Sequence, residues 1–309
     1  MRWHLCTFAA LAVVAPSFAS ADDVPAGLRK STNATSGTTD VAKGGFAAAP
    51  EQEKEEKEKP KDFVRGDLTL GGLVSAGNAR SAAFTASAAL KSRIAAANVL
   101  TFDVALNYAR AGKVGDATGV QQTVGNFQGR GRYERFFTPS LAIFGIASAR
   151  YDKFQGLDLR FNFDPGLAYH FLHDDELNLW GELGYDLQVD MRNDAYLAAA
   201  AAKDPANTYD KTEVRQAARA FLGYEHQLRP GMTLSSGLEY LQGLSAGTKF
   251  KPENVRLNWD VGLKAKIAGE LAVGVSVALK FDNHPLPGVQ NADVVSGINL
   301  QYGFGGPKK

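Results

Sequence analysis

Residues 271–282 read Leu-Ala-Val-Gly-Val-Ser-Val-Ala-Leu-Lys-Phe-Asp, and this stretch decides the fold class. Every odd position from Leu271 to Phe281 holds a large apolar residue, while the even positions from Ala272 to Asp282 are small or charged. Only a β-strand places alternate residues on opposite faces, because a helix would scatter the apolar residues around its circumference. The preceding residues, 257–267, repeat this alternation. Two neighbouring strands with one apolar face are therefore predicted here.

The same period-two pattern continues back to Phe63 in twelve segments: 66–77, 81–92, 98–110, 122–136, 141–152, 157–172, 177–190, 213–228, 232–243, 254–267, 271–282 and 292–304. Each is long enough for a tilted transmembrane strand of about 9–11 residues, whereas strands of soluble proteins average about 5–6. An even number of strands is typical of bacterial single-chain barrels. We predict an all-β fold, a transmembrane antiparallel up-and-down β-barrel of about 12 strands with a disordered N-terminal segment.

The connections between segments alternate in length. Short turns lie at 137–140, 173–176, 229–231 and 268–270, and longer loops at 111–121, 191–212, 244–253 and 283–291. Outer-membrane barrels have short periplasmic turns and longer extracellular loops. With both ends of the chain in the periplasm, only the connection at 77–80 would be a short one on the outer side. Within the 191–212 loop, the alanine-rich run 195–204 predicts a short helix that ends before Pro205.

Aromatic residues on the outward face fall near both ends of the predicted strands. Such girdles are expected where amphipathic rings meet lipid headgroups. The periplasmic girdle consists of Tyr133, Tyr169, Phe171, Tyr224, Tyr302 and Phe304, and the extracellular girdle of Tyr108, Tyr151, Tyr240 and Phe281. The alternative is a soluble barrel with core aromatics, which would not sort its rings to both strand ends.

The N-terminus has the features of an export signal. Arg2 precedes the apolar stretch Leu5–Ala15, and Ala19-Ser20-Ala21 is a small-residue cleavage site. An anchor helix is the alternative, but the apolar stretch is too short to span a bilayer and Pro16 interrupts it. We therefore assign residues 1–21 to a signal peptide, 22–62 to a disordered periplasmic linker, 63–304 to the barrel and 305–309 to a short tail. The linker could also contact a periplasmic partner.

The inward faces of the predicted strands carry many charges of both signs. The candidate lumen-lining residues are Arg130, Arg132, Glu134, Arg160, Asp164, Glu182, Asp186, Arg215, Arg219, Glu225, Glu239, Asp260, Lys264, Lys266, Lys280 and Asp282. They could line a polar pore and set its ion preference, or they could pair across the lumen and fill it. The mixture of signs, and the inward positions of Phe144, Trp180 and Phe221, favour a mostly occluded lumen.

Catalytic and metal sites are not evident in the sequence. The mature histidines His170, His173, His226 and His284 have no serine nucleophile or metal-ligand spacing beside them. The only cysteine, Cys6, lies in the signal, so the mature chain has no disulfide. The net charge of +1 gives no global field for nucleic acid. We predict no enzyme activity, no cofactor and no metal, with isolated outer-loop acids such as Asp116, Asp204 and Asp210 only weak calcium candidates.

Residues near the C-terminus carry a family resemblance. Asn283-His284-Pro285-Leu286-Pro287-Gly288-Val289, Asp293 and Leu300–Phe304, together with 77–78, 151–154 and 166–169, resemble the salt-induced outer-membrane proteins (domain of unknown function family 481) over about residues 65–304. The resemblance implies an outer-membrane barrel without an assigned activity. Tyr302 and Phe304 also resemble the terminal aromatic signal read by the barrel-assembly machinery, although residues 305–309 follow them.

Together these patterns predict a bacterial outer-membrane protein, delivered by Sec-type export and in contact with outer-membrane lipid and the barrel-assembly machinery. The expected role is a narrow or plugged pore that serves envelope integrity or small-solute passage. The alternatives are a lipid-acting membrane enzyme and a scaffold for an envelope complex. The sequence names no solute and no oligomeric state.

Overall fold

The computed structural model describes residues 63–75, 79–94, 97–113, 120–153, 156–174, 176–203, 205, 209–246, 249–250, 252–284 and 291–307. The predicted signal peptide, the linker and the motif pieces at 77–78 and 285–289 lie outside these residues. No helix in the described part of the chain is long and apolar enough to cross a membrane.

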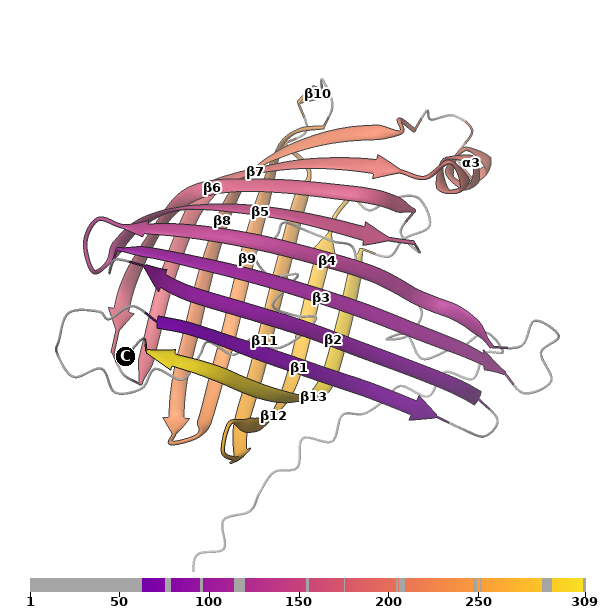
Figure 1. The fold of residues 1–309 in the computed structure, drawn as a ribbon. Coiled ribbons are helices and arrows are strands. Elements are labelled where there is room, and N and C mark those ends of the chain that lie inside the picture. Colours follow the sequence, from indigo (N-terminus) through magenta and orange to yellow (C-terminus); the bar gives the residue numbers. More distant parts are fainter. Residues whose placement is uncertain are drawn as a thin grey trace, which may run out of the picture.

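Thirteen strands and one helix make up the described chain (Figure 1). The strands are β1 (Phe63–Ser75), β2 (Ala79–Ile94), β3 (Asn98–Lys113), β4 (Gln121–Phe136), β5 (Leu141–Asp152), β6 (Leu157–His173), β7 (Leu177–Arg192), β8 (Thr212–Arg229), β9 (Met232–Ala246), β10 (Lys249–Phe250), β11 (Val255–Ala268), β12 (Leu271–Asp282) and β13 (Ala292–Pro307). The helix α3 (Asp194–Lys203) lies in the β7–β8 connection, where the alanine run predicted one.

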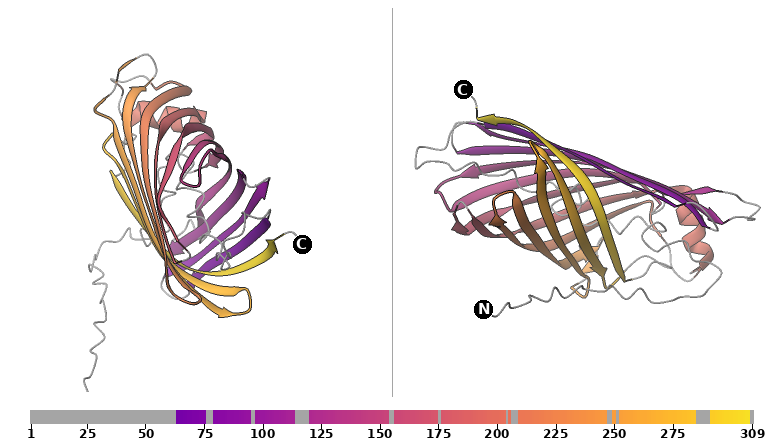
Figure 2. Two further views of the ribbon diagram at one scale, coloured as in Figure 1. Left: turned by 90° about the vertical axis from the view of Figure 1, so that its left-hand side faces the viewer. Right: turned by 90° about the horizontal axis from the view of Figure 1, so that it is seen from below.

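The strands close into a ring. Each strand pairs antiparallel with its neighbours in the order β1 to β9, then β11, β12 and β13, and β13 pairs back onto β1. The two-residue β10 pairs only with β9 and stands outside the ring. The result is the closed 12-strand antiparallel barrel that the alternation predicted. Strands in the two walls cross steeply in Figure 1, and Figure 2 shows the flattened ring from two further sides.

The two faces of the ring differ in polarity. On β12 the even positions are buried, with Ser276 8% exposed, while the odd positions face outward, with Val275 49% exposed. Large apolar side chains such as Leu183, Ile298 and Leu300 stand exposed on the outer face, and most of the buried polar and charged side chains lie on the inner one. The barrel is therefore apolar outside and polar inside, the reverse of an ordinary water-soluble domain.

The predicted girdle residues are mostly exposed on the outside. Exposed members are Tyr108, Tyr133, Tyr151, Tyr169, Phe171, Tyr240, Tyr302 and Phe304, while Tyr224 and Phe281 are half-buried. Tyr224 is partly covered because its hydroxyl lies 2.9 Å from His226 Nδ1. The outward orientation expected from the alternation is thus seen for most of these rings.

The boundary predicted at Phe304 is corrected by the last strand. β13 continues to Pro307, because β1 begins at Phe63 and each residue of its start needs a partner: Phe63 pairs with Pro307 and Arg65 with Gly305. Gly305 adopts a φ of 93°, a left-handed conformation that glycine takes readily. Residues 305–307 therefore belong to the barrel and not to a tail.

Candidate functional site

The inside of the ring is the candidate functional site, and its two ends are distinct. Short turns join β4 to β5, β8 to β9 and β11 to β12 at one end, here called the turn end. The long β7–β8 connection with α3 lies at the other, here called the loop end. Since alternate residues of every strand point inward, the strands deliver a dense set of polar side chains to the lumen between these ends.

The centre of the lumen holds a chain of charged groups. Glu182 on β7 accepts from two arginines: Arg132 on β4 at 2.9 Å and Arg219 on β8 at 2.8 Å. Arg219 also donates to Glu239 on β9 at 2.8 Å, and Arg132 donates to Glu134 on its own strand at 2.6 Å. Glu182, Arg219 and Glu239 are nearly excluded from solvent. This chain of ion pairs links four strands of the wall.

The Arg132–Glu182 pair crosses the inside of the barrel. Two strands, β5 and β6, separate β4 from β7 in the ring. Strands three places apart lie roughly 14 Å apart along a wall with about 4.8 Å between neighbours. A direct ion pair can join them only as a chord through the lumen. The Phe144 ring of β5 lies under this chord, 4.5 Å from the Arg132 guanidinium carbon and 5.6 Å from that of Arg219.

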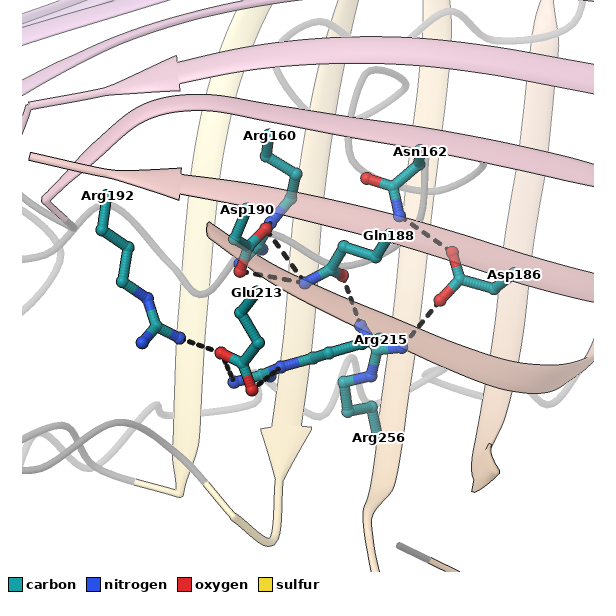
Figure 3. A network of polar contacts seen from close by, with 9 residues as sticks. All are labelled: Arg160, Asn162, Asp186, Gln188, Asp190, Arg192, Glu213, Arg215 and Arg256. Atoms are coloured by element: carbon teal, nitrogen blue, oxygen red, sulfur yellow. Dashed lines mark hydrogen bonds and ion pairs between the residues drawn. The ribbon is translucent and has the colours of Figure 1, made fainter. Parts of the chain in front are cut away.

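A second chord lies nearer the loop end (Figure 3). Arg256 on β11 donates to Asp186 and Gln188 on β7, each at 2.7 Å. Here β8 and β9 stand between the two strands in the ring. Asp186 also accepts from Asn162 on β6 at 2.8 Å, so both of its oxygens are used. The second chord therefore joins side chains from β6, β7 and β11.

Further arginines continue this network toward the loop end (Figure 3). Arg160 on β6 makes a two-pronged contact with Asp190, with distances of 2.5 and 2.6 Å. Glu213 pairs with both Arg192 and Arg215, which holds the start of β8 to the end of β7. Paired guanidinium and carboxylate groups of this kind are strong, directional contacts.

Helix α3 is attached beside this network. Its backbone is capped by Asn193, whose side-chain oxygen accepts from Tyr196 N at 2.8 Å. The Tyr196 ring packs against Gly156 of the β5–β6 connection and lies 5.9 Å from the Arg192 guanidinium carbon. On the solvent side, a hydrogen bond to Asp194 raises the pKa of Lys211 above its ordinary value. Contacts made by its first turn thus fix the helix at the loop end of the barrel.

Aromatic rings gather in the lumen toward the turn end. The His170 ring on β6 stacks on Trp180 of β7 at 6.3 Å and lies 5.6 Å from Phe136. Trp180 in turn contacts Phe221 at 6.1 Å. The tryptophan ring lies over Gly223, where an added Cβ would come within 2.2 Å of it. Inward rings therefore occupy part of this end, as Trp180, Phe144 and Phe221 had suggested.

Charged side chains also interact across the lumen in the half nearer the turn end. Glu225 on β8 lies within electrostatic reach of Lys91 on β2, which stands on the opposite side of the ring, and of Lys264 on β11. By contrast, the wall formed by β12, β13 and β1–β3 presents mostly short side chains to the lumen, among them Thr69, Ala105, Ala109, Ser276, Ala278 and Asn299. Long side chains from one half of the ring thus extend toward a wall of small ones.

The structure brings together many of the residues proposed from sequence. The residues that form ion pairs or hydrogen bonds in the lumen are Arg130, Arg132, Glu134, Arg160, Glu182, Asp186, Arg215, Arg219 and Glu239, and Asp164, Lys280 and Asp282 are buried. Glu225, Asp260 and Lys264 are partly buried. Lys266 is the exception: it is exposed, because it lies at the end of β11 beside the turn to β12.

Several network members were not proposed from sequence. They are Lys91, Asp103, Arg150, Asp152, Gln188, Asp190, Arg192, Glu213 and Arg256. Arg150 and Asp152 sit on the same inward register as Phe144, and Arg256 shares the register of Asp260, so the alternation itself could have identified them. Arg192 was missed because the predicted strand ended at residue 190.

Two of the histidines, His173 and His284, lie at strand ends, whereas His170 belongs to the aromatic cluster in the lumen. His173 is at the β6 end, 3.3 Å from Asn178, and His284 follows β12, where its backbone nitrogen donates to Asp282. Among the described residues, no group of three or more His, Cys, Asp or Glu side chains is arranged to hold a metal ion. The weak calcium candidates Asp116 and Asp204 lie outside the described residues, and Asp210 is exposed.

Comparison with known proteins places the chain in a family. The family described as "Protein of unknown function, DUF481" matches residues 68–304. No curated protein matches the chain. The matched span covers nearly the whole barrel.

Solved structures share the barrel only distantly. The translocator domain of the autotransporter NalP from Neisseria meningitidis is 12% identical, with a TM-score of 0.43, over 80% of this chain and 90% of that one. An outer-membrane channel from Pseudomonas putida F1 is 11% identical, with a TM-score of 0.45, over 82% of this chain and 100% of that one. The NanC porin is 9% identical, with a TM-score of 0.42, over 80% and 100%. These similarities do not bear on what this chain binds or transports.

Proposed function

We propose that this chain, which belongs to the DUF481 family, spans the outer membrane of a Gram-negative bacterium as a narrow pore whose lumen is braced by ion pairs. Such a pore would pass ions and small solutes and would exclude larger ones. The cross-lumen pair between Arg256 and Asp186 is the observation that carries the proposal.

The apolar outer face supports the membrane location. In water, a continuous band of exposed Leu, Ile, Val and Phe side chains would be an aggregation site. In a bilayer the same band is solvated by lipid chains, and a closed ring leaves no unpaired strand edge in the apolar phase. Short turns at one end and longer loops at the other agree with periplasmic and extracellular sides.

The polar interior supports a restricted path rather than an open channel. Twelve strands enclose a lumen between those of filled eight-stranded barrels and open 16-stranded porins. In this barrel the chords Arg132–Glu182 and Arg256–Asp186 divide that space at two levels. The opposite wall presents short side chains that are almost excluded from solvent, which keeps the path through the lumen narrow.

The remaining expectations belong to the same proposal. A Sec-type signal delivers the chain to the periplasm, and the barrel-assembly machinery reads Tyr302 and Phe304 during insertion. Salt induction, the property for which the resembling proteins are named, stays a prediction that transcript levels at low and high salt would test.

Conductance in planar bilayers tests the proposed pore. The refolded full chain should give discrete current steps much smaller than those of a 16-stranded porin measured in the same salt. In liposome swelling, ions and monosaccharide-sized solutes should enter and larger oligosaccharides should not. Absence of current steps above those of a bilayer without protein would contradict the pore, and steps as large as the porin's would contradict the bracing.

A further inference from the structure

A carboxylate without a hydrogen-bond donor lies in the middle of the lumen. Asp164 on β6 is 0% exposed, and among the described residues no N–H or O–H donor hydrogen-bonds to either of its carboxylate oxygens. Its inward neighbour on β5 is the apolar Ile146, also 0% exposed. Burying a carboxylate without donors is costly, so its charge needs compensation from a group that can reach it.

The surrounding charges leave Asp164 uncompensated. Asp186, Arg219 and Glu239 are the charged groups that face it, and the Asp186 carboxylate lies within hydrogen-bonding distance of the Asp164 carboxylate. Asp186 is already paired with Arg256, and Arg219 is already shared between Glu182 and Glu239. Among the described residues around this point, each other carboxylate has an arginine within hydrogen-bond distance. Asp164 is therefore the carboxylate of this group that no arginine of the described residues contacts.

Two other buried atoms nearby lack hydrogen-bonding partners in the part of the chain that the structure describes. Asn258 donates through Nδ2 to Glu239, but its Oδ1 accepts nothing. Arg219 uses Nε and Nη1 for its two glutamates, while Nη2 has no acceptor. Both side chains meet at Glu239, one of the groups that face Asp164. The atoms without partners are therefore of two kinds. The oxygens of Asp164 and Asn258 are acceptors that can face a cation, and Arg219 Nη2 is a donor that can bond to a water molecule bound to that cation.

We propose that Asp164 is the binding point of a singly charged, partly hydrated cation such as Na⁺ or K⁺ in the centre of the lumen. The carboxylate oxygens of Asp164 coordinate the ion, and a water ligand of the ion accepts from Arg219 Nη2. A single charge fits because Asp164 is the one carboxylate of this group that no arginine of the described residues contacts. The ion arrives through the lumen, so the site rests on the proposed pore, but its occupancy can be measured without any current.

Thermal unfolding in salts of different cations tests this site. The heat-unfolding midpoint of the refolded full chain is compared in sodium, potassium and choline chloride at equal ionic strength, since choline is too large for a coordination site of this kind. The midpoint should be higher in sodium or potassium than in choline, and the difference should saturate with concentration as a binding site fills. Equal midpoints in all three salts would overturn the proposal.

Two variants separate binding at Asp164 from general effects. Asp164→Asn removes the charge at constant size and should abolish the difference between sodium and choline, with a midpoint in choline above that of the unmodified chain. Asp190→Asn, which removes the carboxylate paired with Arg160, should lower the midpoint and keep the cation dependence. A cation dependence that survives Asp164→Asn, or a midpoint that responds only to acidification, would show that a proton or bulk screening neutralises Asp164 and would overturn the proposal. Neither outcome changes the result expected from the conductance measurement, which tests the proposed pore separately.

Discussion

Arg256 Nη2 lies 2.7 Å from Asp186 Oδ2, although β8 and β9 separate their strands in the ring. The two residues are seventy positions apart in sequence. Such a contact forms because the wall curves around the lumen, so it links the curvature of the sheet to the electrostatics of the lumen.

Removal of this arginine should destabilise the barrel. Arg256→Ala leaves the Asp186 carboxylate buried with only Asn162 as a donor, and breaking a buried pair in this way costs about 3–5 kcal/mol. The heat-unfolding midpoint of the folded band on a gel should fall clearly. Arg135→Ala removes an exposed arginine from β4 beside its turn to β5 and serves as the control with an unchanged midpoint. Equal midpoints for both variants would contradict the bracing role of Arg256.

The orientation of β12 can be tested by one arginine on each face. Val275→Arg places a charge on the outer face at mid-strand, where contact with lipid should cost about 2–4 kcal/mol. Ser276→Arg places the same side chain in the lumen, beside Gly297, where it can be hydrated or paired. Folding yield into lipid vesicles should drop for the first variant and change less for the second. Similar losses for the two would mean that the outer face is not in lipid.

A glycine lies under an aromatic ring at the seam where β1 pairs with β13. Phe304 on β13 lies over its partner Gly66 on β1, where an added Cβ would be 2.2 Å from the ring. Gly66→Val should therefore cost about 1–3 kcal/mol by overpacking and reduce the fraction of chains that reach the folded band. Gly145→Val is the control, because no neighbouring heavy atom lies within 4 Å of its added Cβ.

A second substitution tests whether a folding defect of Gly66→Val comes from its contact with Phe304 or from a general weakening of β1. Phe304→Ala in the Gly66→Val background should restore part of the folded fraction, since the valine then has room. If Gly66→Val folds as well as Gly145→Val, the Phe304–Gly66 contact does not control closure.

The alternation was sufficient to predict the fold because it reports burial strand by strand. On β12, the even positions that were predicted to face inward are buried, and the bounds Leu271–Asp282 agree with the structure. Ends of strands were less certain. β13 extends to Pro307 because β1 begins at Phe63, and that pairing between the two ends of the barrel has no local signal in either segment.

The lumen network was only partly predictable for the same physical reason. Periodicity shows that Arg132 and Glu182 face inward, but not that they meet. Their contact depends on the curvature of the wall, on the strand stagger and on the reach of the side chains, none of which is encoded in spacing along the chain. The ion pairing that the mixed charges suggested is present, whereas the individual partners, Arg256 above all, required the three-dimensional arrangement.

The most direct test of the braced lumen is a paired measurement on Arg132→Ala. This change removes the central chord to Glu182 and the contact with the Phe144 ring. We predict a lower heat-unfolding midpoint of the folded band together with a larger current across a planar bilayer, because the glutamates lose a partner and the chord no longer divides the lumen. An unchanged midpoint, with only a shift of the reversal potential toward cation selectivity, would contradict the account and would describe an open pore lined by independent charges.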